Sequence, residues 1–284
     1  MTNWKSNASK PVMDEGLQYH IRCKQGDVEK YVLLPGDPDR VDMIGEEWTE
    51  SRKIANYREH RTFSGKVGEV GITACSTGAG GGSTASAFEE LAALGGDTFL
   101  RVGTTAAIQE HINPGDVIIS SGAVRHDGTS QFYVDDRYPA SAHYETTAAL
   151  VEAAERLGYT YHVGVSCSTA SWYCGQGRTG FKGYEQSFFK EKVQDLNKAG
   201  VLNFEMEAAT IFTLAGLYGL RAGSVCTVVA NRIRDEFSYG GVEKSIRVAN
   251  LAVQILAEWD QLKKERQKDY WFPSMAEKDP ALNG

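Results

Sequence analysis

The sequence contains little proline, no closely spaced cysteine pair and no long apolar run. Proline occurs only 7 times in 284 residues, so no proline-rich linker divides the chain into modules. The longest apolar stretches, such as residues 31–35, are far shorter than the roughly 20 residues that cross a bilayer. No apolar segment follows the basic residues near the N-terminus, so no signal peptide is predicted. These absences predict a protein without a membrane partner.

Cysteine is too scattered to build a disulfide framework. The chain has 5 cysteines, an odd number, and none of them belongs to a C-x-x-C pair. Scattered single cysteines are typical of reduced, mostly buried thiols, and the pattern therefore predicts a cytoplasmic protein. The cysteines are Cys23, Cys75, Cys167, Cys174 and Cys226.

Acidic residues outnumber basic residues, which argues against a protein that binds nucleic-acid polymers. The 30 basic and 37 acidic residues leave a net charge of −7, whereas a binder of nucleic-acid polymers needs a basic face. Glycine, in contrast, is in excess: 30 of 284 residues is about 11 %, against a usual value of about 7 %. Glycine without matching proline predicts tight turns and close backbone approaches.

Segments typical of strands alternate with segments typical of helices. This alternation predicts one α/β domain over residues 17–265, with tails over 1–16 and 266–284 and helices on both faces of a sheet. In such folds ligands bind at the carboxyl ends of the strands. The predicted strands cover residues 29–34, 98–102, 117–121, 161–167, 201–204 and 223–230, with a hairpin over 62–76. The predicted helices begin after Asp37 or cover residues 83–94, 150–157, 208–218 and 246–256.

Two predicted strands lead into arginine residues. Arg40 lies one turn into the helix that follows Gly36, and a helix N-terminus beside an arginine can bind an anion. Arg101 lies inside an apolar strand, where an unpaired charge is costly. It therefore forms either a buried salt bridge or the second arm of an anion clamp, with Thr104 and Thr105 on the same rim. The residues alone leave both interpretations open.

Two acidic residues, Glu205 and Glu207, stand where a predicted strand gives way to a helix. They serve either the helix dipole or a grip on neighbouring sugar hydroxyls, with Met206 as an apolar contact. The glycine-rich turn over residues 75–84 fits neither a P-loop nor G-x-G-x-x-G, but it lets the backbone approach another group. No H-E-x-x-H metal motif and no G-x-S-x-G nucleophile elbow occurs in the sequence, so neither a catalytic metal nor a covalent nucleophile is predicted.

Seven motifs occur in order over roughly residues 19–256, about five-sixths of the chain. They are LPGDPDR, CSTGAGG, FLRVGTT, HINPGD, GQGR, NFEMEAAT and VANR. In this order and spacing the chain resembles the nucleoside phosphorylase family, in its pyrimidine-cleaving uridine phosphorylase branch. The resemblance implies a three-layer α/β/α sandwich around a mixed, partly barrel-like β-sheet. It also implies reversible phosphorolysis of uridine to uracil and ribose 1-phosphate, with inorganic phosphate as co-substrate and no cofactor.

The resemblance further implies where each part of the substrates binds. Phosphate would meet Gly36, Arg40, Arg101 and Thr104, with Arg58 supplied by a second copy of the chain. The ribose would meet Thr104, Met206 and Glu207, with His20 of the second copy at the 5′-hydroxyl. The base would meet Thr105, Ala106, Trp172, Gln176, Arg178, Glu205 and Arg232, with Tyr173 beside Trp172 in an aromatic wall. The residues implied to act in catalysis are Arg101, Glu207, Gln176 and Arg178.

The base-reading residues make chemical sense for uracil. A glutamine amide and an arginine supply the donors and the acceptor that match O2, N3 and O4 of the base. These hydrogen bonds strengthen as negative charge develops on the departing uracil. Purine-cleaving members of the family carry an Asp where this chain has Asn231, and hydrolytic members lack the arginine clamp. Both differences favour a pyrimidine phosphorylase.

Several points stay open at this stage. Ala106 replaces a glycine of bacterial members, and its added methyl group would narrow the base pocket, which leaves open whether thymidine or 5-substituted uracils are accepted. A shifted specificity, such as a preference for thymidine or 2′-deoxyuridine, is one alternative. Cys174 and Gly177 replace a common proline and glutamate near the GQGR motif. A catalytically silent nucleoside-binding protein is another alternative. The resemblance implies a homodimer as the smallest active unit and leaves a hexamer open. It also leaves open an interface potassium ion near Glu59, Ala79 and Ser83.

Overall fold

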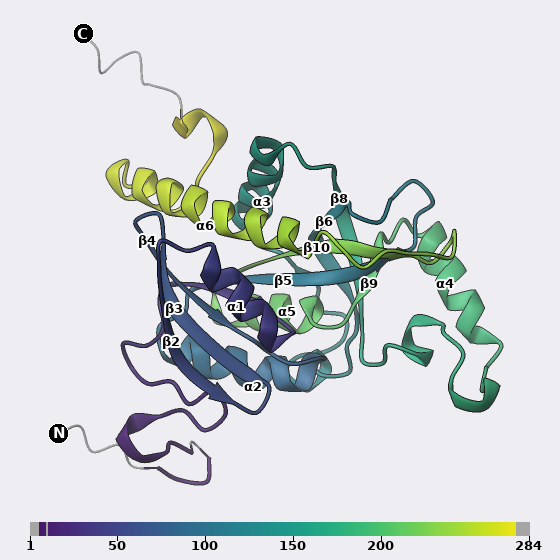
Figure 1. Ribbon diagram of the computed structural model, residues 1–284, viewed down its shortest axis with the longest axis horizontal. Helices are drawn as coiled ribbons and strands as arrows, with labels where there is room; N and C mark the ends of the chain where they lie inside the picture. The colour runs from purple at the N-terminus through teal and green to yellow at the C-terminus, as the bar shows by residue number, and fades with distance from the viewer. Residues whose placement is uncertain (1–5, 10, 277–284) are drawn as a thin grey trace.

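The computed structural model describes residues 6–9 and 11–276, and the outermost parts of both predicted tails lie outside these ranges (Figure 1). The described residues form six α-helices: α1 (Pro38–Glu46), α2 (Gly81–Ala93), α3 (Tyr144–Leu157), α4 (Phe188–Lys198), α5 (Ala208–Tyr218) and α6 (Val242–Glu265). The strands are β1 (Tyr31–Pro35), β2 (Glu50–Tyr57), β3 (His60–Val67), β4 (Val70–Cys75), β5 (Thr98–Ala107), β6 (Val117–His126), β7 (Ala140–Ser141), β8 (Tyr161–Thr169), β9 (Asn203–Glu205), β10 (Arg221–Asn231) and β11 (Glu236–Phe237). Short 3-10 turns include η1 (Asp14–Gly16), η3 (Cys174–Gln176) and η5 (Pro273–Ala276).

The strands of the described residues all join one mixed sheet. Its order is β11-β10-β6-β8-β9-β5-β1-β4-β3-β2, with β7 beside β6. Because β10 also pairs in parallel with β5, the strands β5, β10, β6, β8 and β9 close on themselves. This ring is the barrel-like part of the sheet, and β1, β4, β3 and β2 extend it as an open sheet.

Helices cover both faces of this sheet. Residues of α1, α3 and α6 share one hydrophobic core with the strands, and residues of α2 and α5 share another. Figure 1 shows α3 and α6 above the sheet and α2 and α5 below it. The predicted α/β/α sandwich with a mixed, partly barrel-like sheet is therefore confirmed.

Local sequence signals account for the helix ends that were predicted. Helix α1 begins at Pro38, and the side chain of Asp37 accepts a hydrogen bond of 3.0 Å from the main-chain N–H of Asp39. Helix α3 ends at Gly158, which has a φ of 66°. Proline suits the first helical position, and glycine suits a left-handed position after the last turn. Both ends follow from short-range stereochemistry.

The sheet extends further than the sequence predicts. Strand β5 continues to Ala107 and strand β6 to His126, although they were predicted to end at residues 102 and 121. Each of these strands pairs with neighbours on both sides in the ring, and this pairing supports residues that lack strand propensity. Strand β2 and helix α4 were not predicted, because β2 is mostly exposed and α4 buries only Phe189.

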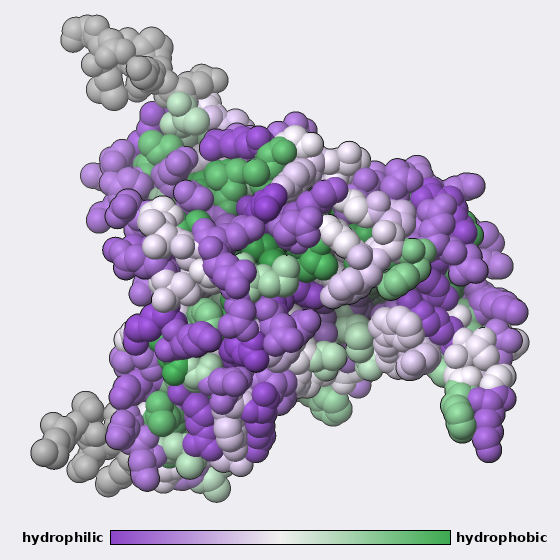
Figure 2. All heavy atoms as spheres, in the orientation of Figure 1, coloured by the Kyte–Doolittle hydropathy of each residue, from purple (hydrophilic) through white to green (hydrophobic). Residues whose placement is uncertain are grey.

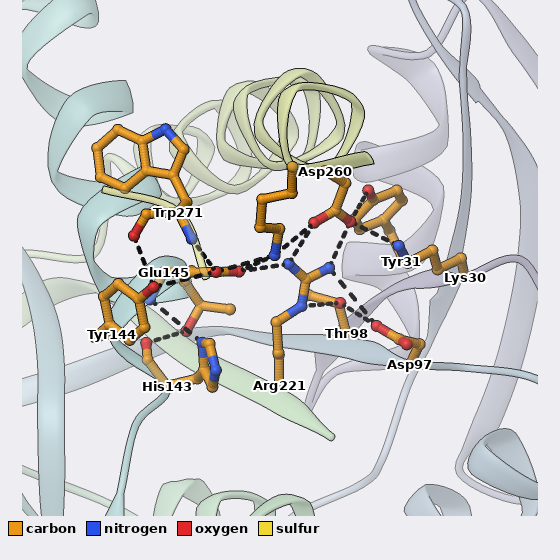
Figure 3. A network of polar contacts seen from close by, with 12 residues as sticks. Lys30, Tyr31, Asp97, Thr98, His143, Tyr144, Glu145, Arg221, Asp260 and Trp271 are labelled. Carbon is orange, nitrogen blue, oxygen red and sulfur yellow. Dashed lines mark hydrogen bonds and ion pairs between the residues drawn. The ribbon is translucent and has the colours of Figure 1, made fainter. Parts of the chain in front are cut away.

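The segment that follows α6 packs back onto the domain. The ring of Trp271 stacks on Trp259 with 3.7 Å between the ring centroids, and Met275 is fully buried. The main-chain N–H of Trp271 donates to the carboxylate of Glu145 in α3, as Figure 3 shows. The C-terminal aromatics therefore dock locally, while the division into a domain and two tails stays a prediction.

Figure 2 shows a mostly hydrophilic face on which hydrophobic residues form separate patches. Among the residues that the structure covers, no helix combines the length and the apolar character that a membrane crossing requires. All five cysteines are free thiols.

Candidate active site

A cavity of about 340 Å³ opens where several strands of the ring end. It lies against the loops that follow β1 and β4, the second half of β5, the loop after β8, the junction of β9 with α5, the end of β10, and β11. The convergence of distant segments at strand ends follows the general rule for α/β sheets. The lining includes Gly36, Arg40, Arg101, Thr104, Thr105, Ala106, Trp172, Gln176, Arg178, Glu205, Met206 and Glu207, all of which were predicted site residues.

Two buried guanidinium groups face this cavity. The Nη1 atom of Arg40 donates a hydrogen bond of 3.1 Å to the main-chain oxygen of Val102, which fixes the side chain against β5. Burial lowers the pKa of Arg40, and the positive charge of Arg101 lowers it further. A nearby anion would reduce the repulsion between these two cations.

Two of the three nitrogen atoms of the Arg101 guanidinium contact carboxylates. Its Nε donates to Glu205 at 2.7 Å, and its Nη2 pairs with the carboxylate of Glu207. Burial disfavours the charged guanidinium, but Glu207 and Glu205 outweigh burial and raise the pKa of Arg101. Its buried Nη1 atom has no hydrogen-bond partner within the described part of the chain. The structure therefore shows the buried salt bridge, and the anion clamp stays a prediction that the remaining nitrogen atom allows.

Gly103, two residues after Arg101, leaves room for the Arg101 guanidinium because it has no side chain. A Cβ atom at Gly103 would lie 2.7 Å from the sulfur of Cys226 and 3.2 Å from Nη2 of Arg101. The guanidinium thus lies back across Gly103 on the same face of β5. Gly103 lies within β5, although that strand was predicted to end at residue 102, and the close approach there is made by Arg101.

The two glutamates occupy different environments. The oxygens of Glu205 accept hydrogen bonds from the side chain of Ser168, from Nε of Arg101 and from the main-chain N–H groups of Glu207 and Ala208. Both oxygens of Glu205 are thus engaged by the protein, although the residue belongs to the cavity wall. These contacts argue against direct base binding by Glu205.

Glu207 keeps more of its capacity for a ligand. One oxygen accepts a hydrogen bond of 2.6 Å from the main-chain N–H of Gly80, and the other pairs with Arg101. Burial raises the pKa of Glu207, and Arg101 opposes this rise. Through this hydrogen bond from Gly80, the glycine-rich turn contacts Glu207. Met206 lies between the two glutamates and lines the cavity.

Gln176 and Arg178 form the other end of the cavity. Nη1 of Arg178 contacts the side-chain oxygen of Gln176 and donates to the main-chain oxygen of Trp172 at 2.7 Å. The guanidinium carbon of Arg178 lies 3.7 Å from the centroid of the Trp172 ring. Burial and the nearby charge of Arg232 lower the pKa of Arg178 to about 10. The amide nitrogen of Gln176 makes no side-chain hydrogen bond within the described ranges, and it is available to a ligand.

Two predicted neighbours of the base lie outside the cavity lining. Arg232 donates a hydrogen bond of 2.9 Å to the main-chain oxygen of Gln176, so it supports the loop that carries Gln176 from behind. Tyr173 packs edge-on against Trp172 and is 60 % exposed. The predicted aromatic wall is therefore formed by Trp172 without Tyr173.

Thr104 and Thr105 of β5 differ in how far the protein uses the hydrogen-bonding capacity of their hydroxyls. The hydroxyl of Thr105 donates to the main-chain oxygen of Phe204 at 2.7 Å and accepts from the side chain of Asn203 at 2.6 Å. The Thr104 hydroxyl has no hydrogen-bond partner in the described residues and lines the cavity. Ala106 presents its methyl group to the cavity wall. Of the two hydroxyls, that of Thr104 is the one available to a ligand.

Two predicted site residues lie away from the cavity of their own chain. His20 contacts Glu90, which accepts hydrogen bonds from Nδ1 of the ring at 2.8 Å and from the main-chain N–H at 3.0 Å. Arg58 is exposed, with its guanidinium carbon 5.6 Å from the centroid of the Tyr19 ring. The ring of Tyr19 also packs against His20, with 4.9 Å between the centroids. His20 and Arg58 therefore share one surface around Tyr19.

A second hollow of about 510 Å³ adjoins the glycine-rich turn. Glu59, Ala79 and Ser83, the positions near which the resemblance leaves open a potassium ion, line this hollow. Their donor atoms are oxygens, which suit a hard cation. Among the described residues no group of three or more His, Cys, Asp or Glu side chains is placed to hold a metal ion.

Other lining residues were not predicted from the sequence. Phe237 lies in the short strand β11 and is 73 % exposed at the cavity. Nothing in its local sequence marks it as a site residue, since only the pairing of β11 with β10 brings it there. The remaining lining residues that were not predicted to contact a substrate are Asp37, Gly78, Ala79, Phe204, Val229 and Ala230.

Comparison with known proteins identifies the family of this chain. Residues 30–258 match the family described as the phosphorylase superfamily. The chain belongs to the phosphorylase superfamily. It is 56 % identical to the uridine phosphorylase of Thermococcus kodakarensis over 95 % of this chain and 97 % of that protein. It is 42 % identical to the uridine phosphorylase of Escherichia coli over 87 % of this chain and 98 % of that protein. A guanosine phosphorylase of Halorubrum lacusprofundi is 37 % identical over 84 % of this chain and 99 % of that protein.

Proposed function

We propose that this chain catalyses the reversible phosphorolysis of uridine to uracil and ribose 1-phosphate. The observation that carries the proposal is the buried, unpartnered Nη1 of Arg101, beside a second buried guanidinium and between a carboxylate and a Gln-x-Arg pair. Similarity to several uridine phosphorylases supports the choice of nucleoside. The arginines supply the anion site that distinguishes a phosphorylase from a hydrolase.

Phosphate binds between Arg40 and Arg101 in this proposal. Nη1 of Arg101 donates to one phosphate oxygen, and Arg40 and the Thr104 hydroxyl contact the others. Gly36 also lines the cavity, and a Cβ atom there would lie only 3.2 Å from the main-chain oxygen of Gly78, so the loops after β1 and β4 pack closely at this point. Placing phosphate beside the anomeric carbon converts a bimolecular attack into a positioned one.

The ribose binds between phosphate and base. Glu207 accepts hydrogen bonds from neighbouring ribose hydroxyls, and Met206 packs against the apolar face of the sugar. As the C1′–N1 bond breaks, the sugar gains positive charge. The carboxylate of Glu207 and the incoming phosphate stabilise that charge. A phosphate oxygen then forms the new bond to C1′.

The base leaves with the electron pair of the C1′–N1 bond. The Gln176 amide and the Arg178 guanidinium bind the polar edge of uracil and stabilise the negative charge that develops on it. The departing uracil takes up a proton to become neutral. Stacking of Arg178 on Trp172 keeps the guanidinium in one orientation for this task. Base-lining contacts come from Ala106 and from Trp172, while Thr105, Glu205 and Arg232 act by positioning their neighbours.

The environment of Asn231 supports a pyrimidine substrate. Its side-chain nitrogen donates to the main-chain oxygens of Gln109 and Ile112, at 2.9 and 2.8 Å. An ionised aspartate has no proton to donate to two carbonyl groups. The amide is therefore required for the fold of this loop, and no acid stands at this position to protonate a purine.

The proposal includes a second copy of the chain. His20 and Arg58 lie together around Tyr19 and away from the cavity of their own chain. We propose that this surface completes the cavity of a partner subunit, with Arg58 at phosphate and His20 at the 5′-hydroxyl. Assembly into a hexamer, an interface potassium ion and a cytoplasmic location stay predictions.

Uracil release from uridine, with and without phosphate, tests the proposed function. We expect release to require phosphate and ribose 1-phosphate to form in equal amount. Release that ignores phosphate contradicts the proposal. Uridine, 2′-deoxyuridine, thymidine and inosine compared in the same assay identify the nucleoside, and a preference for inosine would overturn the interpretation of Asn231. A preference for 2′-deoxyuridine or thymidine would support the alternative of a shifted specificity.

A further inference from the structure

A buried serine contacts the site from outside the cavity. Ser168 lies in β8, is fully buried and does not line the cavity. Its hydroxyl donates to Oε1 of Glu205 and accepts a hydrogen bond of 2.8 Å from the main-chain N–H of Ala209 in α5. The serine therefore ties a strand of the ring to both the carboxylate of Glu205 and the start of helix α5.

Contacts on both oxygens fix the plane of the Glu205 carboxylate. Oε2 accepts bonds from Nε of Arg101 at 2.7 Å and from the main-chain N–H groups of Glu207 and Ala208 at 2.8 Å each. Ser168 is the hydrogen-bond donor to Oε1 within the described residues. Without the serine, one oxygen loses its partner and the carboxylate gains freedom to rotate about its last bond.

The orientation of Glu205 determines the direction of Arg101. The guanidinium is planar, and Glu205 at Nε and Glu207 at Nη2 hold two of its edges. Gly103 lies against its face. With those contacts made, the unpartnered Nη1 points in one direction. A rotation of the Glu205 carboxylate turns the guanidinium and moves Nη1 away from the position of the anion.

We propose that Ser168 is a positioning residue for phosphate, acting through Glu205 on Arg101. The inference rests on the proposed function, because it assigns phosphate to Nη1 of Arg101. It deepens that function by adding a residue that touches neither substrate. The hydroxyl of Ser168 and the N-terminus of α5 thus hold the residues that bind phosphate, without contacting phosphate themselves.

Ser168 is a better probe of this arrangement than Glu205. Replacing Glu205 by Gln removes a negative charge near an anion site, which by itself favours phosphate. Replacing Ser168 by Ala changes no charge. A weaker interaction with phosphate in Ser168→Ala therefore reports orientation alone.

The first experiment measures steady-state kinetics of Ser168→Ala with phosphate and uridine varied separately. We expect the KM for phosphate to rise about tenfold, since a buried charge-assisted hydrogen bond is lost. The KM for uridine should stay within about twofold, because no ribose or base contact changes. An unchanged KM for phosphate, or equal rises in both KM values, overturns the proposal.

Ser120→Ala is the matched control. Ser120 is a buried serine of β6, and its hydroxyl bonds to that of Ser166 at 2.6 Å with no contact to Glu205. A general loss of packing would affect both serine variants alike. We expect Ser120→Ala to keep both KM values within about twofold of the original protein. If it matches Ser168→Ala, the effect is structural and the inference is wrong.

Two further measurements keep the inference separate from the proposed function. Calorimetric titration with inorganic phosphate, without nucleoside, should show the same loss of roughly tenfold in Ser168→Ala. This titration does not depend on which nucleoside is cleaved, so a failure of the uridine assay with wild-type protein contradicts only the proposed function. Unchanged phosphate affinity in the variant contradicts the inference. If Ser168→Ala does not fold, Ser168→Cys keeps the volume with a weaker donor and should raise the KM for phosphate severalfold.

A double-variant cycle tests the route through Glu205. In a Glu205→Gln background the carboxylate is gone, so adding Ser168→Ala should change the KM for phosphate by less than about twofold. A further rise of about tenfold would mean that Ser168 acts independently of Glu205 and would refute the proposed route.

Discussion

Glu205 and Glu207 make different contacts because the backbone changes direction between them. Strand β9 ends at Glu205, and helix α5 begins directly after Glu207. Glu205 points toward the start of α5 and accepts its main-chain N–H groups, while Glu207 turns toward Arg101 and Gly80. On a continuous strand the two side chains would share one face. The strand-to-helix switch is therefore what gives Glu207 partners that differ from those of Glu205.

Glu207→Gln tests the assignment of ribose binding at this scale. The substitution keeps the size of the side chain but removes the charge that stabilises both the ribose hydroxyl contacts and the developing positive sugar. We expect kcat/KM for uridine to fall about 100-fold, or roughly 2.7 kcal/mol. Steady-state kinetics measures this loss. An activity within threefold or so of the original would contradict the assignment.

At the scale of elements, strand β10 connects the site with a buried ionic network. Arg221 at the start of β10 donates to both oxygens of Asp260 at 2.7 Å and to Glu145 at 2.8 Å (Figure 3). Lys263 of α6 bonds to the same carboxylate of Glu145. The network joins β10 to α3, α6 and the segment that carries Trp271. Val229 and Ala230 near the far end of β10 line the cavity, so the network anchors a strand that reaches the site.

Asp260→Asn is expected to destabilise the fold without changing the site. The substitution leaves part of the charge of Arg221 unpaired in a mostly buried place, at a cost on the order of 3 kcal/mol near pH 7. Chemical denaturation measures the free energy of unfolding. The KM for phosphate, measured in the folded variant, should stay unchanged. A stability equal to that of the original protein would show that the network contributes nothing.

The same variant carries a pH prediction. Burial disfavours ionisation of Asp260, but hydrogen bonds from Arg221 and Lys30 outweigh it and lower the pKa of Asp260 in the folded state. An unfolded Asp titrates near 3.9 or so. The stabilisation is therefore present above that pH and is lost as pH falls toward the folded pKa. We expect the stability difference between the original protein and Asp260→Asn to shrink between pH 7 and about pH 3. A constant difference would rule out this linkage.

At the scale of the whole molecule, two residues that the resemblance assigns to the site lie away from the cavity of their own chain. His20 and Arg58 come from segments far apart in sequence and share the surface around Tyr19, yet neither lines the cavity. A two-fold dimer can bring such a surface to the cavity of its partner in both directions. This arrangement accounts for two implied site residues that the tertiary structure of one chain leaves outside.

Mixing two inactive variants tests the shared site. Arg101→Ala disables the cavity of its own chain, and Arg58→Ala disables the cavity of its partner. In a mixed dimer one of the two cavities retains both arginines. Refolding the variants together in equal amounts should restore about a quarter of the original activity, because about half of the dimers are mixed and each has one intact site. No recovery, with mixed dimers shown to form, argues that each chain builds its site alone.

Much of the fold could be predicted because its signals are local. Pro38 after Asp37 marks the start of α1 and Gly158 the end of α3, since each residue type matches a particular backbone conformation. The short exposed strand β11 carries no such signal, so Phe237 was not predicted. The lengths of β5 and β6 depend on partners from distant segments, which no local pattern contains.

The sequence by itself determined the residue types of the site, the family and the α/β class, because motifs and periodicity are written in short stretches. Only the tertiary structure decided how the polar groups are divided between fold and ligand. Thr105, Glu205 and Arg232 turn out to bond to the protein, while one nitrogen of Arg101 has no hydrogen-bond partner among residues 6–9 and 11–276. Hydrogen-bonding capacity is limited at each atom, and it is consumed by neighbours that come together only when the chain folds.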